Sequence, residues 1–296
     1  MSNLKSGRFP FFPESPSEQD LRHYRENSKF KPFLREDPFF LLPEFNYHIA
    51  LSGGQTSAYL LHRILQRNDN RLPENAVVIF TNTGKEREET LQFLRNIELR
   101  WEVSITWLEF HRDEQRRGVK GDPKNTYRIV DFESAARDGE PFSVACAVQQ
   151  TIPGTNQRFC TSRLKIMPAE QYVTKELGWK RTSTRKLLGI RADEPSRASV
   201  AWLSECPVEL PLMSAAVTRP QIQDFWQQND FRLEIPSYLG NCDCCFMKSQ
   251  NIMKRVIQEE PGRLDWWIWV EETYGRKGHR FRRDMKMRDL KTATLN

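Results

Sequence analysis

The chain has 296 residues and a formal net charge of +6, long enough for one large domain or two smaller ones with a hydrophobic core. No apolar run reaches the roughly 18–20 residues of a membrane span. Residues 1–16 lack the apolar core of a secretory signal, so we expect a cytoplasmic protein with no membrane partner.

The ends of the chain differ in composition from its middle. Residues 1–45 are rich in Phe and Pro, and we predict an irregular arm that wraps the body or binds a protein partner. Residues 276–296 hold eight Lys or Arg and two Asp or Glu, an excess equal to the net charge of the whole chain. Such a basic tail can bind nucleic-acid phosphates, or it can be a solvated helix or solubilising terminus.

Between the two ends, apolar runs alternate with helical patterns. This alternation favours a parallel sheet with crossover helices, so we predict an α/β fold, a doubly wound, mostly parallel sheet with helices on both faces. Polar residues 111–158 are predicted as an insertion or lid. The predicted strands are 47–51, 76–82, 103–110 and 185–190, and the predicted helices are 57–66, 84–97, 163–177, 219–230, 251–260 and 265–275.

The first predicted strand runs into a glycine loop, Ser52-Gly53-Gly54-Gln55-Thr56-Ser57. The loop matches neither G-x-x-x-x-G-K-[ST] nor G-x-G-x-x-G. Glycines nevertheless let a backbone approach phosphates, and the amides at a helix start favour an anion. The hydroxyls of Ser52, Thr56 and Ser57 add donors. From these residues alone, both a phosphate site and a simple tight turn remain open.

The pattern Ser52-Gly53-Gly54-x-x-Ser57 resembles the PP-loop of the adenine nucleotide α-hydrolase-like superfamily, which includes ATP pyrophosphatases, tRNA thiolation enzymes and sulfonucleotide (PAPS/APS) reductases. Two later stretches are similar to reductase segments, Thr81–Gly84 with Glu89-Thr90, and Gly189–Glu194. Gln55-Thr56 departs from the usual Lys-Asp. With this change the loop is more similar to that of phage-encoded, mobile-element and CRISPR-associated reductase-like proteins.

The resemblance implies a HUP-like PP-loop nucleotide-binding domain over 46–235, with a cysteine motif and helical extension over 236–275. It implies that ATP or a related adenine nucleotide, with Mg²⁺, is split between its α and β phosphates. The catalytic residues it implies are Ser52, Thr56, Ser57 and Arg191, and Lys85 is a further candidate phosphate partner. The nucleotide-binding set it implies is Ser52, Gly53, Gly54, Gln55, Thr56, Ser57, Thr81, Asn82, Thr83, Gly84, Arg158, Gly189 and Arg191.

Cys242-Asp243-Cys244-Cys245 contains a C-x-x-C pair, which can hold zinc or an iron–sulfur cluster, act as a redox dithiol, or be buried without a chemical role. The stretch 158–165, RFCTSRLK, resembles the first half of the APS reductase cluster motif, with Phe159 in place of one cysteine. The resemblance implies a [4Fe–4S] cluster on Cys160, Cys242 and Cys245, with Zn²⁺ as the alternative metal. Cys244 is an alternative ligand. We predict that Cys146 and Cys206 are buried thiols. We expect Asn241, Phe246 and Lys248 to surround the cluster.

No cysteine follows Cys245, so the nucleophile that sulfonucleotide reductases carry near the C-terminus is missing. The first predicted function is an ATP α-hydrolase or adenylylating enzyme, acting in sulfur transfer to a nucleic acid or in its processing. The second is a nucleic-acid-associated accessory protein that uses the fold to bind a nucleotide. The third is a PAPS/APS reductase with an external thiol.

Three further groups of residues have predicted places. Trp266, Trp267 and Trp269 resemble a base-stacking platform, but their helical spacing favours core or interface packing. His48 and His62 are predicted to be structural. Glu86, Glu88 and Glu89 are expected in the first turns of a helix, where carboxylates are favourable.

Overall fold

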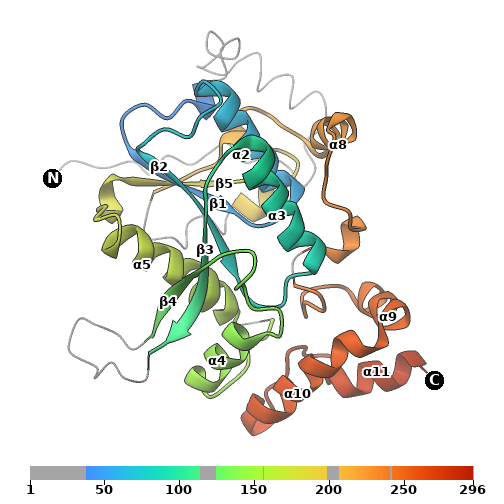
Figure 1. The fold of residues 1–296 in the computed structure, drawn as a ribbon. Helices are drawn as coiled ribbons and strands as arrows, with labels where there is room; N and C mark the ends of the chain where they lie inside the picture. The colour runs from blue at the N-terminus through green and yellow to red at the C-terminus, as the bar shows by residue number, and fades with distance from the viewer. Residues whose placement is uncertain (1–37, 114–124, 156, 199–206, 241, 296) are drawn as a thin grey trace, which may run out of the picture.

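The computed structural model describes residues 38–113, 125–155, 157–198, 207–240 and 242–295 (Figure 1). These residues contain a six-stranded sheet in the order β4-β3-β2-β1-β5-β6. All neighbouring pairs are parallel except β3 with β4, which confirms the predicted α/β class. The strands are β1 (Asn46–Leu51), β2 (Ala76–Asn82), β3 (Ile105–Arg112), β4 (Asn125–Val130), β5 (Thr184–Leu188) and β6 (Val208–Glu209).

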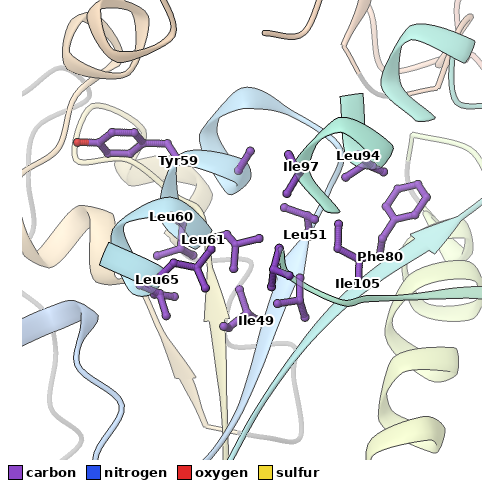
Figure 2. Packing of buried hydrophobic residues seen from close by; sticks show 14 of the residues in the cluster. Ile49, Leu51, Tyr59, Leu60, Leu61, Leu65, Phe80, Leu94, Ile97 and Ile105 are labelled. Atoms are coloured by element: carbon purple, nitrogen blue, oxygen red, sulfur yellow. The ribbon is translucent and has the colours of Figure 1, made fainter. Parts of the chain in front are cut away.

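Helices cover both faces of the sheet. On one face, α2 (Gln55–Arg67), α3 (Glu88–Trp101) and α8 (Arg219–Gln228) build the main apolar core, part of which Figure 2 shows. On the other face, α5 (Met167–Lys175) packs on β2 and β3. Shorter helical turns are η2 (Pro38–Phe40), η4 (Arg181–Ser183), α6 (Pro195–Ala198), α7 (Pro211–Ser214), η6 (Ser237–Leu239), η7 (Pro261–Leu264) and η8 (Arg276–Gly278).

A second apolar core lies at one end of the molecule, where the C-terminal helices meet α4 (Glu140–Gln149). These helices are α9 (Gln250–Glu259), α10 (Asp265–Tyr274) and α11 (Met287–Leu295). Residues 276–296, predicted as a basic tail, are named the basic segment from here on. Its residues Phe281, Met287 and Leu290 are fully buried in this core. The Glu271 carboxylate accepts the Phe281 and Met287 amides at 3.0 and 2.8 Å. The basic segment is therefore packed against the body.

Several elements differ from the sequence prediction. The stretch predicted as an insertion or lid is instead part of the fold. Its strand β4 pairs antiparallel with β3 at the edge of the sheet, and its helix α4 packs in the second core. The helix expected from residue 84 begins at Glu88. Glu86 precedes this helix and is buried. Its carboxylate accepts a hydrogen bond from the Thr83 amide at 2.8 Å.

Some predictions fall on residues outside the described ranges. Residues 1–37 of the predicted arm, Cys206 and Asn241 are among these. At the described end of the arm, Phe40 and Leu42 are buried in the main core. In the part of the chain that the structure describes, no helix combines the length and apolarity needed to cross a bilayer.

Candidate functional site

A cavity of about 480 Å³ opens where β1, β2 and β5 end. Its floor is formed by alternate strand residues, which all project from the same face of the sheet. Ligands of open parallel sheets bind at the carboxyl ends of the strands, so the position suits a binding site. The floor residues are His48 and Ala50 of β1, Ile79 and Thr81 of β2, and Lys186 and Leu188 of β5.

The glycine loop forms one wall of this cavity through Ser52 and Ser57. Ser57 Oγ accepts the Ser52 amide at 3.0 Å and donates to the Gly54 carbonyl at 3.0 Å. Gly53 has φ +77°, and a Cβ there would lie 2.5 Å from Thr90 Cγ2. A Cβ on Gly189 would lie 2.9 Å from Ser57 Cα, so only glycine lets the end of β5 pass this closely.

The predicted nucleotide-binding residues divide into two groups. Those that line the cavity are Ser52, Ser57, Thr81, Thr83, Arg158 and Gly189. Gln55 instead lines a separate hollow of about 400 Å³ beside α8, and its carbonyl accepts the Trp226 indole N–H at 3.0 Å. Asn82 shapes the next turn, because its Oδ1 accepts the Gly84 amide at 3.0 Å.

Arg191, predicted as catalytic, is engaged by its own neighbours. Its guanidinium lies 2.8 Å from Asp193 and 3.3 Å from Glu194, and it also donates to Thr56 Oγ1 at 3.3 Å. Neither Thr56 nor Arg191 is among the residues that line the cavity. In this arrangement both residues brace the start of α2 against the end of β5.

The three predicted thiol ligands line the same cavity as the glycine loop. Cys160 precedes a π-helix, η3 (Thr161–Ile166), and Cys242 and Cys245 belong to residues 242–248, which we name the cysteine loop. Burial raises the pKa of the Cys160 and Cys242 thiols, which favours their neutral form. Among the described residues, no group of three or more His, Cys, Asp or Glu side chains is arranged to hold a metal ion.

The other described cysteines lie outside this cavity. Cys146 is fully buried in the second core, as predicted, and burial raises its pKa. Cys244 is also fully buried, and burial together with the Asp243 carboxylate raises its pKa to about 12.

Lys165 is a cavity residue that sequence reasoning missed. It lies five positions after Cys160, and in an α-helix that spacing turns a side chain well away from the first. The observed π-helix has i→i+5 hydrogen bonds and a wider turn, which reduces the angle between the two positions, and both Cys160 and Lys165 line the cavity. Burial opposes its charge, but nearby acidic groups, Cys242 and Glu86 first, outweigh this and raise the pKa of Lys165.

Among Lys, Arg, Asp and Glu side chains, those that line the described cavity are all cationic. Arg158, Lys165, Lys186 and Arg197 line it, and no Asp or Glu is among its lining residues in the described part of the chain. Low-dielectric walls with charge of one sign attract a ligand of the opposite sign. The arrangement therefore suits an anionic ligand that reaches three thiols.

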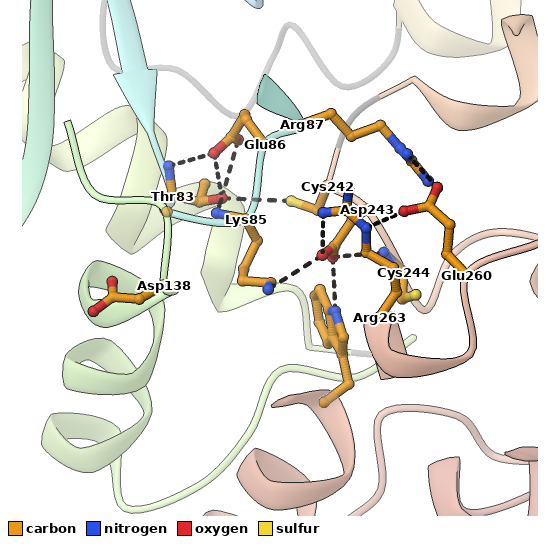
Figure 3. A network of polar contacts seen from close by, with 12 residues as sticks. Thr83, Lys85, Glu86, Arg87, Asp138, Cys242, Asp243, Cys244, Glu260 and Arg263 are labelled. Atoms are coloured by element: carbon orange, nitrogen blue, oxygen red, sulfur yellow. Dashed lines mark hydrogen bonds and ion pairs between the residues drawn. The ribbon is translucent and has the colours of Figure 1, made fainter. Parts of the chain in front are cut away.

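A buried polar network joins the cysteine loop to residues 83–87, the loop after β2 (Figure 3). Asp243 lies at its centre, and the Lys85 ammonium is 3.1 Å from Asp243 Oδ2. Lys85 Nζ also lies 4.7 Å from the centre of the Trp266 ring. Lys85, predicted as a phosphate partner, is absent from the cavity lining. Its ammonium is instead held by Asp243.

No protein-family model matches the chain, but it is similar to a phage protein and to solved structures. An uncharacterized nin region protein, ORF290, of Escherichia phage lambda is 29% identical over 218 residues, which cover 72% of this chain and 70% of that protein. This confirms the expected likeness to a phage-encoded protein, whereas the CRISPR link stays a prediction. The crystal structure of a phosphoadenylyl-sulfate (PAPS) reductase from Candida auris, in complex with phosphate, matches with a TM-score of 0.38 and 17% identity, over 74% of this chain and 90% of that one.

Proposed function

We propose that the cavity binds an adenine nucleotide and that the protein is an enzyme that cleaves it between the α and β phosphates. One observation carries the proposal. The glycine-loop hydroxyls, four cationic side chains and three thiols line a single cavity that no described carboxylate lines. A polyphosphate matches this chemistry, because hydroxyls, amides and cations stabilise its negative oxygens.

The described residues suggest a role for each wall. Ser52 and Ser57 face the phosphates, next to the amides at the start of α2. Arg158 and Lys165 stabilise negative charge, including that of the departing pyrophosphate, whereas Arg197 is paired with Glu194 at 2.8 Å. Ala50, Ile79 and Leu188 offer an apolar floor against which a base can pack. The oxygen of an acceptor, or of water, attacks the α-phosphorus.

The described lining residues include no Asp or Glu, so they offer Mg²⁺ no carboxylate ligand. Mg²⁺ is commonly held by substrate phosphates and water with few protein ligands. We therefore expect the ion to enter with the nucleotide rather than to occupy a site of its own.

The thiol trio fits a thiophilic group by the chemistry of its donors. Cys160, Cys242 and Cys245 come from two segments and line one cavity, although in the described arrangement the three thiols are not grouped to hold a metal ion. Thiolates bind both iron–sulfur clusters and zinc. We assign a [4Fe–4S] cluster first and Zn²⁺ as the alternative. Such a cluster, when bound, would carry an external ligand such as sulfide for transfer to an activated acceptor.

Binding of either group must displace thiol protons, because burial raises the pKa of Cys160 and Cys242. Metal uptake is then weaker at low pH than at high pH. Absorption spectra with iron and zinc analysis after anaerobic purification distinguish the two assignments, and stoichiometric zinc would contradict the cluster.

The experiment for the enzyme is incubation with Mg-ATP followed by separation of the products. AMP and pyrophosphate are expected, and ADP alone, or bound ATP without cleavage, would contradict the proposal. Arg158→Gln should weaken cleavage by about tenfold or more, because it removes a phosphate-facing charge. Arg163→Gln is the matched control, since Arg163 lies five positions after Arg158 in the chain but does not line the cavity. Sulfite release from PAPS with thioredoxin tests the reductase alternative.

A nucleic acid is the acceptor class that a second surface favours. Trp267 is buried as predicted, but Trp269 is 47% exposed and packs edge-on against Tyr274, next to the basic segment. Exposed aromatic rings beside cations bind single-stranded bases and phosphates. Truncation at residue 276 would remove core residues Phe281 and Met287. Trp269→Ala with Arg276→Glu is therefore the cleaner test, and unchanged RNA and DNA binding would contradict this role.

A further inference from the structure

The cysteine loop and the loop after β2 are joined by a buried pair of opposite charges. Asp243 is 1% exposed and Lys85 is 8% exposed, and their charged atoms lie 3.1 Å apart. The backbone adds a second connection between the same residues, because the Asp243 amide donates to the Lys85 carbonyl at 2.9 Å. Both the side chains and the main chain therefore fix the distance between the two loops.

The other oxygen of Asp243 orders the cysteine loop itself. Its Oδ1 accepts the Cys244 amide at 2.7 Å and the Trp267 indole N–H at 2.8 Å. Trp267 is fully buried in the second core. A buried carboxylate is tolerated only when its donors are in place, so these bonds restrict where Asp243 and its neighbour Cys242 can lie.

The loop after β2 also contacts the thiol directly. Thr83 Oγ1 lies 3.5 Å from Cys242 Sγ. Glu86 holds Thr83 in turn, since its carboxylate accepts the Thr83 amide and hydroxyl, each at 2.8 Å. Thr83 and Cys242 both line the cavity. The loop after β2 therefore lines the cavity through Thr83, and it also contacts the cysteine loop, as Figure 3 shows.

We propose that Lys85 and Asp243 form a positioning clamp that holds Cys242 against Thr83, and that a nucleotide in the cavity changes the accessibility of Cys242 through the loop after β2. Neither clamp residue lines the cavity, so both act through other residues. The nucleotide-dependent part rests on the proposed function. The part that concerns the ligand-free protein does not rest on the proposed function.

The test measures the rate at which a maleimide labels Cys242 relative to Cys160, resolved by peptide mass spectrometry on the full chain after metal chelation. In Lys85→Met and in Asp243→Asn, this ratio should rise by about fivefold or more as the cysteine loop opens locally. Lys291→Met is the control, because Lys291 forms an ion pair with Asp265 in the helical region rather than with a residue of the cysteine loop. The double variant should show no further rise, since the two residues act as one unit.

Two results in the ligand-free protein would overturn the clamp. One is an unchanged ratio in both single variants. The other is an equal acceleration of Cys160 and Cys242, which would indicate general loosening of the fold. Additive effects in the double variant would also contradict a paired action.

The second arm repeats the labelling with saturating Mg-ATP. In the wild-type chain, ATP should slow Cys242 by about fivefold or more, and Lys85→Met should lose this selective protection. Full protection in Lys85→Met would overturn the coupling. If the wild-type chain binds no ATP, the proposed function fails, while the ligand-free ratio still decides whether the clamp exists.

Discussion

The two faces of the central strands differ in how they are filled. On one face, Ile49 and Leu187 are fully buried in the core formed with α2 and α3. On the other face, His48 and Leu188 border the cavity. Adjacent residues of the same strand therefore serve packing and binding, because successive side chains point to opposite faces. Apolar composition identifies a buried strand without showing which face is filled.

Two leucines on β5 give the sharpest test of this difference. Leu187→Ala should lower the free energy of unfolding by about 2–5 kcal/mol, because it leaves a void in a packed core. Leu188→Ala removes the same atoms from a side chain that already borders open space. It should therefore lower the free energy of unfolding by less than Leu187→Ala does, with a difference of about 1 kcal/mol or more. Urea unfolding of both variants measures the values. Equal losses would show that the cavity face is as tightly packed as the other.

Two glycines where β1 meets α2 provide the next test. Gly53→Ala should lower the free energy of unfolding by about 1–3 kcal/mol, because the φ of +77° strains an L-residue and the new Cβ would lie 2.5 Å from Thr90 Cγ2. Gly54→Ala should change it by less than about 0.5 kcal/mol, since its Cβ would meet only Ser52 Oγ at 3.7 Å. Urea midpoints compare the two variants. A similar loss in both would contradict a requirement for the left-handed conformation at Gly53.

The fold was largely predictable because its signals are local. Apolar runs gave β1, β2 and β5 to within one or two residues, and helical spacing gave α2, α8, α9 and α10. β4 was missed, since an edge strand such as NTYRIV has one poorly covered side. The packing of Phe281 and Met287 was missed because the surrounding charge dominates the composition.

The site was only partly predictable from local signals. Spacing and resemblance identified residues that do share the cavity, among them Ser52, Ser57 and the three thiols. Lys165 escaped because the π-helix changes the helical repeat. The Lys85–Asp243 pair escaped because it joins residues 158 positions apart, and nothing in either local pattern indicates that contact.

His48 tests the cavity face with the smallest expected effect. It is 4% exposed and opposite Lys186 in the parallel register, and burial, with that lysine, holds its pKa well below the ordinary value. The folded chain thus keeps His48 neutral, whereas the unfolded chain takes up a proton below a pKa of about 6.5. The stability of the folded state should therefore fall with pH below that value, by up to about 1.4 kcal/mol for each pH unit from this group. Other groups titrate as well, so the measurement is the difference between wild-type and His48→Gln urea unfolding at pH 7.5 and at pH 5.5. The variant should lose less stability on acidification, because no imidazole is left to protonate in the unfolded chain. Parallel losses would mean that His48 takes up its proton in the folded state as well, and that water reaches this part of the cavity floor.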